Sequence, residues 1–287
     1  MELVMAVIFL RRKVVMTIKA LFQRILDSAS LLRSFIIYLR NHLKVSNNNK
    51  CTFFNIHCNG NYITLSGKHE DLSCATTSFL RECVVHMEGN NNSFVINDQS
   101  FVYGEGVKTV FVCGNDNRII VGEDCSLRKV SFFIRGCGNR IVIGDHCSAY
   151  AVQFHIEQNE NEIYVGSRTT LHGRDEHSIH MAVDEGSKIL IGEDCMFSHG
   201  IQIRSTDSHS IVDRNGARLN SARNVVIGRH CWIGLQSVIL KGTVLEHNCV
   251  VGAGAVCSKK YAKSNCVLAG NPAKIVREYV DWDRKFV

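Results

Sequence analysis

Proline is almost absent from this chain. A single proline, Pro272, stands against 22 glycines in 287 residues. Proline-rich linkers are therefore excluded, and a chain of this length with 45% hydrophobic residues can bury a sizeable core. The start also lacks a long apolar run. The short run in MELVMAVIFLRRK precedes its positive charges, the reverse of a secretion signal, and is too short to cross a bilayer.

Paired cysteine motifs are missing as well. The chain has 13 cysteines, an odd number, and no CxxC pair, so neither a disulfide scaffold nor a zinc site is indicated. Four cysteines end the repeated motifs VGEDC, IGDHC, IGEDC and IGRHC, at Cys125, Cys147, Cys195 and Cys231. We expect them to be reduced and buried as small apolar residues, which favours a cytoplasmic protein.

The net charge of +6 is concentrated at one end. Residues 1–45 carry eight Lys and Arg against Glu2 and Asp27, whereas the remainder carries 25 of each sign. Apolar residues near helical spacing predict a basic amphipathic helical extension over 1–46. Such a helix suits peripheral contact with anionic membrane lipid, or it caps an open end of the fold. No basic face with interleaved aromatics supports binding to nucleic acid.

The second half of the chain repeats with a period of six. Aliphatic residues recur at this interval, at Ile227, Ile233, Ile239, Leu245 and Val251. A small residue follows four positions after each of them, at Cys231, Ser237, Thr243, Cys249 and Ala255. Neither a helix nor a flat strand has this period over such a length, whereas a solenoid with three short sides per coil does. The aliphatic side chains then point into a triangular prism, and the small ones sit at its corners.

The repeat divides the chain into segments. Degenerate coils with Asn or Gly turns are expected over 47–190, where Asn117, Asn139 and Asn161 are spaced by 22 residues. Regular hexapeptide coils are expected over 191–270, and a tail or short helix over 271–287. One interruption, STDSHSIVDRNGARLNSAR, breaks the rhythm and predicts a loop over 204–223 that leaves the prism. The predicted fold is thus an all-β parallel β-helix with a helical extension.

Several motifs resemble those of the hexapeptide-repeat acyltransferases. ILIGEDCMFSHGIQIRSTDSHSI, VVIGRHCWIG, VVGAGAV and LAGNPAKIVRE stand in the order found in acetyl-CoA-dependent sugar O-acetyltransferases. The stretch from EDCMFSHG through NPAKIV to WDRK is most similar to bacterial capsular polysialic-acid O-acetyltransferases. The resemblance implies a left-handed β-helix, a homotrimer with active sites between subunits, acetyl-CoA as donor and a carbohydrate acceptor, plausibly sialic acid.

The resemblance also implies roles for individual residues. His209, in the predicted loop, corresponds to the general base, since imidazole can remove a hydroxyl proton near neutral pH. Trp232 is the second candidate catalytic residue. It follows an inward Cys231 and should point outward, either into the acceptor and pantetheine channel or into a packing contact. Arg204 could meet the carboxylate of an acidic sugar, and Asp207 could orient the base or hold the loop. His199 could contact substrate or serve a structural role.

Coenzyme A is expected along the C-terminal coils, where flat backbone edges can bind pantetheine and cations can reach phosphate. The candidate residues are Trp232, Gly234, Ala253, Gly254, Ser258, Lys259, Lys274 and Arg277. Cys257 and Tyr261 depart from the residues usual in the family nearby. No metal is expected.

Two other functions stay open at this point. HGRDEH supplies His172 and His177, with His155 and His199 flanking, so a zinc hydratase on the same fold is one alternative, which needs three histidines to converge across subunits. A structural or membrane-docked scaffold is the other. The combination of the TDSH loop, an outward Trp232 and C-terminal cations favours instead an O-acetyltransferase of a surface-polysaccharide sugar. We expect it to be cytoplasmic and peripheral to the inner face of the membrane.

Overall fold

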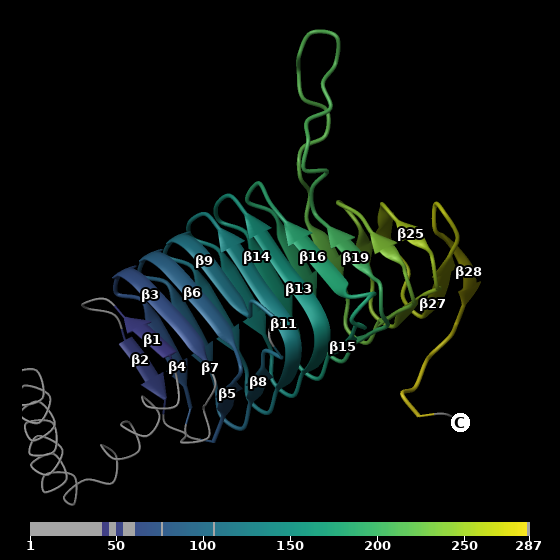
Figure 1. The fold of residues 1–287 in the computed structure, drawn as a ribbon. Coiled ribbons are helices and arrows are strands. Elements are labelled where there is room, and N and C mark those ends of the chain that lie inside the picture. The colour runs from purple at the N-terminus through teal and green to yellow at the C-terminus, as the bar shows by residue number, and fades with distance from the viewer. Residues whose placement is uncertain (1–41, 46–49, 54–60, 76, 106, 286–287) are drawn as a thin grey trace, which may run out of the picture.

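The computed structural model describes residues 42–45, 50–53, 61–75, 77–105 and 107–285. These residues are all-β and stack as one long solenoid (Figure 1). Most of the predicted helical extension lies outside the described residues. Its last residues form strand β1 (His42–Val45) and not helix, because they pair in parallel with Tyr62–Leu65 of the next coil. None of the described segments is a helix long and apolar enough to cross a membrane.

The solenoid has three faces, and each coil contributes a strand to each face in turn. The first face is a ten-stranded parallel sheet. Its strands are β2 (Lys50–Phe53), β4 (Asp71–Cys74), β7 (Ser93–Ile96), β10 (Arg118–Val121), β12 (Arg140–Ile143), β14 (Glu162–Val165), β17 (Lys188–Ile191), β20 (Val225–Ile227), β23 (Val244–Leu245) and β26 (Lys260–Tyr261).

The second and third faces join in an 18-stranded sheet. The second face holds β5 (Phe79–Arg81), β8 (Phe101–Tyr103), β15 (Thr170–His172), β18 (Met196–Phe197), β21 (Trp232–Ile233), β24 (Cys249–Val251) and β27 (Cys266–Ala269). The third face holds β1, β3 (Tyr62–Lys68), β6 (Val84–Asn90), β9 (Val110–Asn115), β16 (Ile179–Val183), β19 (Gln202–Arg204), β22 (Val238–Ile239) and β25 (Val256–Cys257).

Two long strands run around the corner between the second and third faces. They are β11 (Ser126–Arg135) and β13 (Ser148–Glu157), and each pairs with strands of both faces. Lys129 and Ala151 have positive φ angles of 51° and 50°, so each strand turns at a single left-handed residue. This sharp bend is what keeps the coil triangular where no loop intervenes.

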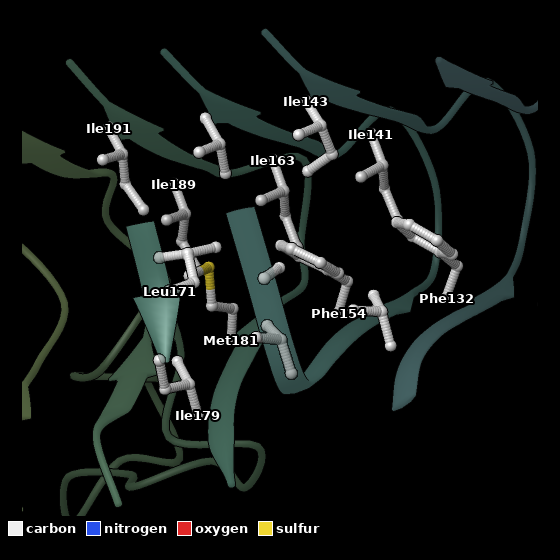
Figure 2. Close-up of a cluster of buried hydrophobic side chains, with 14 of the residues drawn as sticks. Phe132, Ile141, Ile143, Phe154, Ile163, Leu171, Ile179, Met181, Ile189 and Ile191 are labelled. Carbon is white, nitrogen blue, oxygen red and sulfur yellow. The ribbon is translucent and has the colours of Figure 1, made fainter. Parts of the chain in front are cut away.

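The interior is filled by the side chains that the repeat predicted to point inward. Ile227, Ile233, Ile239, Leu245 and Val251 are all at most 1% exposed, and the small residues four positions after each are fully buried too. Earlier coils add larger side chains, and Phe132 and Phe154 stack with centroids 5.2 Å apart. Figure 2 shows such side chains from several coils converging on one continuous core. The all-β parallel β-helix is thereby confirmed.

Coil length changes along the axis. In the upstream coils Arg118 pairs with Arg140 of the next coil, 22 residues on, whereas Ile227 pairs with Leu245 in the shorter coils near the C-terminus. The Asn spacing in the sequence reflects a buried ladder. Each Asn Nδ2 donates to the Oδ1 of the previous asparagine, at 2.9–3.0 Å, through Asn92, Asn117, Asn139 and Asn161. These side chains are 1% exposed, so they stabilise the corner between the third and first faces from inside.

The C-terminal end is closed by a strand of opposite direction. Strand β28 (Lys274–Glu278) pairs antiparallel with β27, so the segment that was expected to be a tail or short helix begins as a strand. Tyr261 is 4% exposed and donates its hydroxyl proton to the carbonyl of Ala273 at 3.2 Å. Burial raises the pKa of Tyr261 to about 12. Tyr261, which departs from the residue usual in the resembled family, therefore closes the C-terminal end of the core.

Candidate active site

A long loop leaves the solenoid between β19 and β20, at the corner of the third and first faces (Figure 1). Its root continues the buried polar ladder. The backbone N–H of Ser187 donates to Asn161 Oδ1 at 3.1 Å, and the Ser187 hydroxyl donates to Ser205 Oγ at 2.7 Å. Ser205 is fully buried. The rigid corner thus holds the point from which the loop starts, as the break in the repeat predicted.

Asn220 closes the base of the loop. Its Nδ2 donates to the carbonyl oxygen of His209 and to Oδ2 of Asp207, both at 2.8 Å. Its Oδ1 accepts the backbone N–H of Ile211 at 2.7 Å, and the side chain is only 8% exposed. One buried amide therefore ties together the two strands of the loop on either side of the candidate base. Nothing in the spacing of the sequence marks Asn220 as part of the site.

Two ion pairs fasten the loop to neighbouring coils. Lys241 pairs with Asp207, and also donates to the carbonyl of Asn220 at 2.7 Å. The hydrogen bond from Lys241 holds the pKa of Asp207 below its usual range. Arg218 pairs with Glu185 of the preceding coil, which lowers the pKa of Glu185. Asp207 was expected either to orient the base or to hold the loop, and its contacts with Asn220 and Lys241 hold the loop.

His209 lies next to this closed base, and its side chain is exposed. Its backbone carbonyl is held by Asn220, while no described residue makes a hydrogen bond to its ring. The main chain at this position is therefore restrained while the imidazole faces solvent. An imidazole in this situation can accept a proton from a bound hydroxyl group.

Arg204 ends β19 immediately before the loop, and it donates to Ser208 Oγ at 3.0 Å. Both residues line a hollow of about 440 Å³, together with His180 and Asp184. His199 lies between β18 and β19, at the corner that joins the second and third faces. Its ring centroid is 6.0 Å from that of His177. Partial desolvation lowers the pKa of His199, assisted by Arg174 and His177.

Trp232 begins β21 on the second face, and 37% of the residue is exposed. It points outward as predicted, because its neighbour Cys231 is fully buried. The hexapeptide repeat does not mark its companion Trp282. The Trp282 ring stacks on His230 at 4.4 Å and lies 6.2 Å from the Trp232 ring. His230 Nδ1 in turn lies 2.6 Å from Asp194 Oδ2. Because Trp282 belongs to the C-terminal segment, this segment borders the exposed Trp232.

The glycines proposed for coenzyme A gather at the corner between the second and third faces. A Cβ atom on Gly234 would lie 2.5 Å from the carbonyl oxygen of Val251, so only glycine lets the two coils approach there. Gly254 has a φ of 67° with open space around it, and Ala253 beside it is exposed. This corner therefore presents accessible backbone of the kind that pantetheine can contact.

The polar and cationic candidates lie nearer the C-terminal end. Ser258 and Lys259 follow β25 at the corner of the third and first faces, and Lys259 Nζ is 5.7 Å from the Tyr261 ring centroid. Lys274 and Arg277 belong to β28, and all four side chains are exposed. Cations that are free to move can meet the phosphates of a coenzyme.

The predicted residues thus occupy different corners of one copy. His209 is on a loop from the third–first corner, whereas Trp232 lies at the start of the second face and Gly234 at the second–third corner. The structure does not bring His209 and Trp232 onto one face of the chain.

The zinc alternative needs metal-binding side chains that converge on one point. No group of three or more His, Cys, Asp or Glu side chains arranged to hold a metal ion occurs in the part of the chain that the structure describes. His172 lies on the second face beside Ser148, at 3.2 Å, whereas His155 lies on the third face and stacks on Phe133 at 4.5 Å. Most of the described cysteines are buried.

Comparison with known proteins supports the class that the coils and loop define. Residues 224–259 match the family described as hexapeptide repeat of succinyl-transferase. A polysialic acid O-acetyltransferase of Neisseria meningitidis is 34% identical over 199 residues, which are 69% of this chain and 88% of the relative. One from Escherichia coli O1:K1 / APEC is 31% identical over 103 residues, 36% of this chain and 33% of the relative.

Solved structures agree with the sequence relatives. The polysialic acid O-acetyltransferase OatWY has a TM-score of 0.61 at 29% identity, over 77% of this chain and 91% of its own. The polysialic acid specific acetyltransferase NeuO has a TM-score of 0.53 at 27% identity, over 79% of this chain and 86% of its own. The chain belongs to the hexapeptide-repeat acyltransferases, in the group that contains the polysialic acid O-acetyltransferases.

Proposed function

We propose that this protein transfers the acetyl group of acetyl-CoA to a hydroxyl group of a surface-polysaccharide sugar, and that the sugar is sialic acid of a capsule. The observation that carries the proposal is the exposed imidazole of His209, held by its carbonyl at the closed base of the loop, in a chain 34% identical to a polysialic acid O-acetyltransferase. A scaffold protein has no need of a buried amide that restrains one exposed histidine.

The reaction needs no covalent intermediate with the protein. His209 takes the proton of the acceptor hydroxyl while its oxygen attacks the thioester carbonyl, and the tetrahedral intermediate then expels coenzyme A. The departing thiolate receives the proton that the imidazolium holds, so the base is regenerated. The loop ties supply the fixed position that such a transfer requires.

Coenzyme A is assigned to the C-terminal coils. Ala253 and Gly254 leave backbone exposed for pantetheine, and the buried Gly234 lets the neighbouring coils approach closely beside them. The exposed Ser258, Lys259, Lys274 and Arg277 supply a hydroxyl and three cations for the phosphates. Trp232 borders the acceptor and pantetheine channel, and Arg204 meets the acceptor carboxylate. His199 and Asp207 support the same channel.

A homotrimer with sites between subunits accounts for the spread of these residues. Apolar side chains on the loop are more than half exposed, at Ile211, Val212 and Leu219. Exposed apolar side chains grouped on a projecting loop are typical of a surface that contacts another chain. A neighbouring copy can therefore bring its Trp232 and its second–third corner to the His209 of the first. We place the trimer in the cytoplasm, with residues 1–46 in peripheral contact with the membrane.

The test is to incubate the pure protein with acetyl-CoA and a panel of sialylated and neutral glycans, and to measure thiol release. His209→Ala should lower turnover by on the order of 10²–10⁴, the usual contribution of a positioned general base, while the affinity for acetyl-CoA stays nearly unchanged. His69→Ala, which removes an exposed histidine from a distant coil, serves as the control. Wild-type turnover in His209→Ala would remove this residue from the mechanism, and a protein that does not bind acetyl-CoA would be a scaffold.

A further inference from the structure

A column of stacked rings runs along the outside of the third face. The β-sheet register places His86, Phe111, Phe133 and His155 side by side on successive coils. Their ring centroids are 5.4, 5.1 and 4.5 Å apart, with interplanar angles of 13–15°. All four side chains are half-buried, so one edge or face of each ring stays open to solvent. We call these four residues the ring column.

The ring column is continuous in register with the active-site loop. His155 pairs with Ala182, which pairs with Arg204, the last residue before the loop. A hollow of about 670 Å³ is lined by Phe111, Phe133 and His155, and the 440 Å³ hollow beside Arg204 is also lined by His155. The two hollows therefore meet at His155 and lead from the upstream coils to the residues that precede His209.

Polar side chains form a second column beside the rings. Ser131, Gln153, His180 and Gln202 face outward at paired positions of successive strands. His180 Nδ1 lies 3.3 Å from Gln202 Oε1, and burial lowers the pKa of His180. These groups offer hydroxyl, amide and imidazole partners at regular intervals. The core of an interface between protein chains is mostly apolar, so this polar column fits such an interface poorly.

Cations lie over the rings. Lys108 Nζ is 4.1 Å from the Phe111 centroid, and Arg135 Cζ is 5.6 Å from the Phe133 centroid. Both cationic side chains are exposed, so their charges reach solvent beside the rings. Exposed ring edges, hydrogen-bonding side chains and cations in parallel columns match the apolar faces, hydroxyl groups and carboxylates of an acidic sugar chain.

We propose that the ring column is a binding track for the acceptor polymer, which lies along the third face and presents one sugar to His209. The proposal rests on the function proposed above and adds that the enzyme holds several consecutive sugars. Each coil adds a rung about 4.8 Å from the last, so a chain that covers more coils gains more contacts.

The experiment measures KM and kcat for sialic acid oligomers of increasing length with wild-type protein, Phe133→Ala and Tyr164→Ala. Tyr164 is the matched control, because it is a 39% exposed aromatic residue on the first face, outside the track. KM should fall with length in the wild type. Phe133→Ala should raise KM for long chains by on the order of tenfold, with little change for the shortest acceptor or in kcat, and Tyr164→Ala should match the wild type.

Three outcomes would overturn the track. One is a wild-type KM that does not depend on chain length. Another is a Phe133→Ala variant that raises KM equally for short and long acceptors. The third is a Phe133→Ala variant that changes oligomeric state by light scattering and loses activity with every acceptor, which would assign the ring column to contacts between copies. Failure of the proposed function is separate: the wild type would then acetylate no sialic acid acceptor of any length.

Discussion

At the scale of single residues, the candidate site depends on how a backbone carbonyl is held. We propose His209 as the general base, and Asn220 decides where His209 lies, because its amide bonds to that carbonyl and to Asp207 simultaneously. The amide is nearly buried, so water does not readily replace these hydrogen bonds. A small polar side chain eleven residues away thus sets the geometry of the base.

Asn220→Ala is expected to loosen the base of the loop. Turnover should fall by about 10- to 100-fold, because a displacement of about 1 Å can cost that much in an acyl transfer, while KM for acetyl-CoA should stay unchanged. Asn215→Ala removes an exposed asparagine from the tip of the same loop and should leave both constants as in the wild type. Steady-state kinetics on the three proteins checks this, and a wild-type kcat for Asn220→Ala would show that the loop base does not position His209.

At the scale of elements, one buried ladder supports both the irregular coils and the loop. Asn117, Asn139 and Asn161 repeat every 22 residues, and the serines Ser187 and Ser205 continue the line to the root of the loop. A hydrogen-bonded ladder of this kind fixes coil register where hexapeptide spacing is lost, because a one-residue slip would leave buried amides without partners. The upstream coils are thus degenerate in sequence but regular in their polar contacts.

Asn139→Ala should break this ladder in the middle. The substitution removes the amide that now bonds to the Nδ2 of Asn161 and to the carbonyl of Gln158. We therefore expect the free energy of unfolding to fall by about 1–3 kcal/mol. Asn215→Ala, at an exposed site, should stay within about 0.5 kcal/mol of the wild type. Urea unfolding at equal protein concentration compares them, and equal midpoints would mean that the ladder contributes nothing to stability.

At the scale of the whole molecule, the three-sided coil separates the parts of the site. Strands of one coil face three directions, so the loop corner and the Trp232 face of a single copy point apart. Stacked coils are rigid, and the chain cannot bend to bring these surfaces together. Cyclic assembly of identical copies is the simple way to join one corner of a copy to another corner of its neighbour.

Mixing two inactive variants tests this arrangement. His209→Ala and Trp232→Ala subunits, unfolded together and refolded at a one-to-one ratio, should recover about a quarter of wild-type activity if each site takes the two residues from different copies. The control mixes His209→Ala with the double variant His209→Ala/Trp232→Ala, and should recover nothing. If mixed oligomers form without any recovery, the two residues do not meet across the subunit boundary.

The sequence by itself determined the coil. A period of six in aliphatic and small residues is compatible with few structures other than a three-sided solenoid, so the inward Ile227 series and the outward Trp232 could be predicted. The loop was predictable for the same reason, since a break in a strict repeat must leave the stack. His209 followed from the position of that break together with the resemblance to a known family.

Only the tertiary structure decided which residues hold and extend the site. Asn220, Lys241 and Glu185 meet at the loop base from three separate places in the chain, and no local spacing marks such a meeting. In the ring column Phe111, Phe133 and His155 are 22 residues apart, but His86 precedes Phe111 by 25, so no single spacing marks the whole column. Its alignment exists only because hydrogen bonds between coils set the register, and that register is a long-range property of the folded sheet.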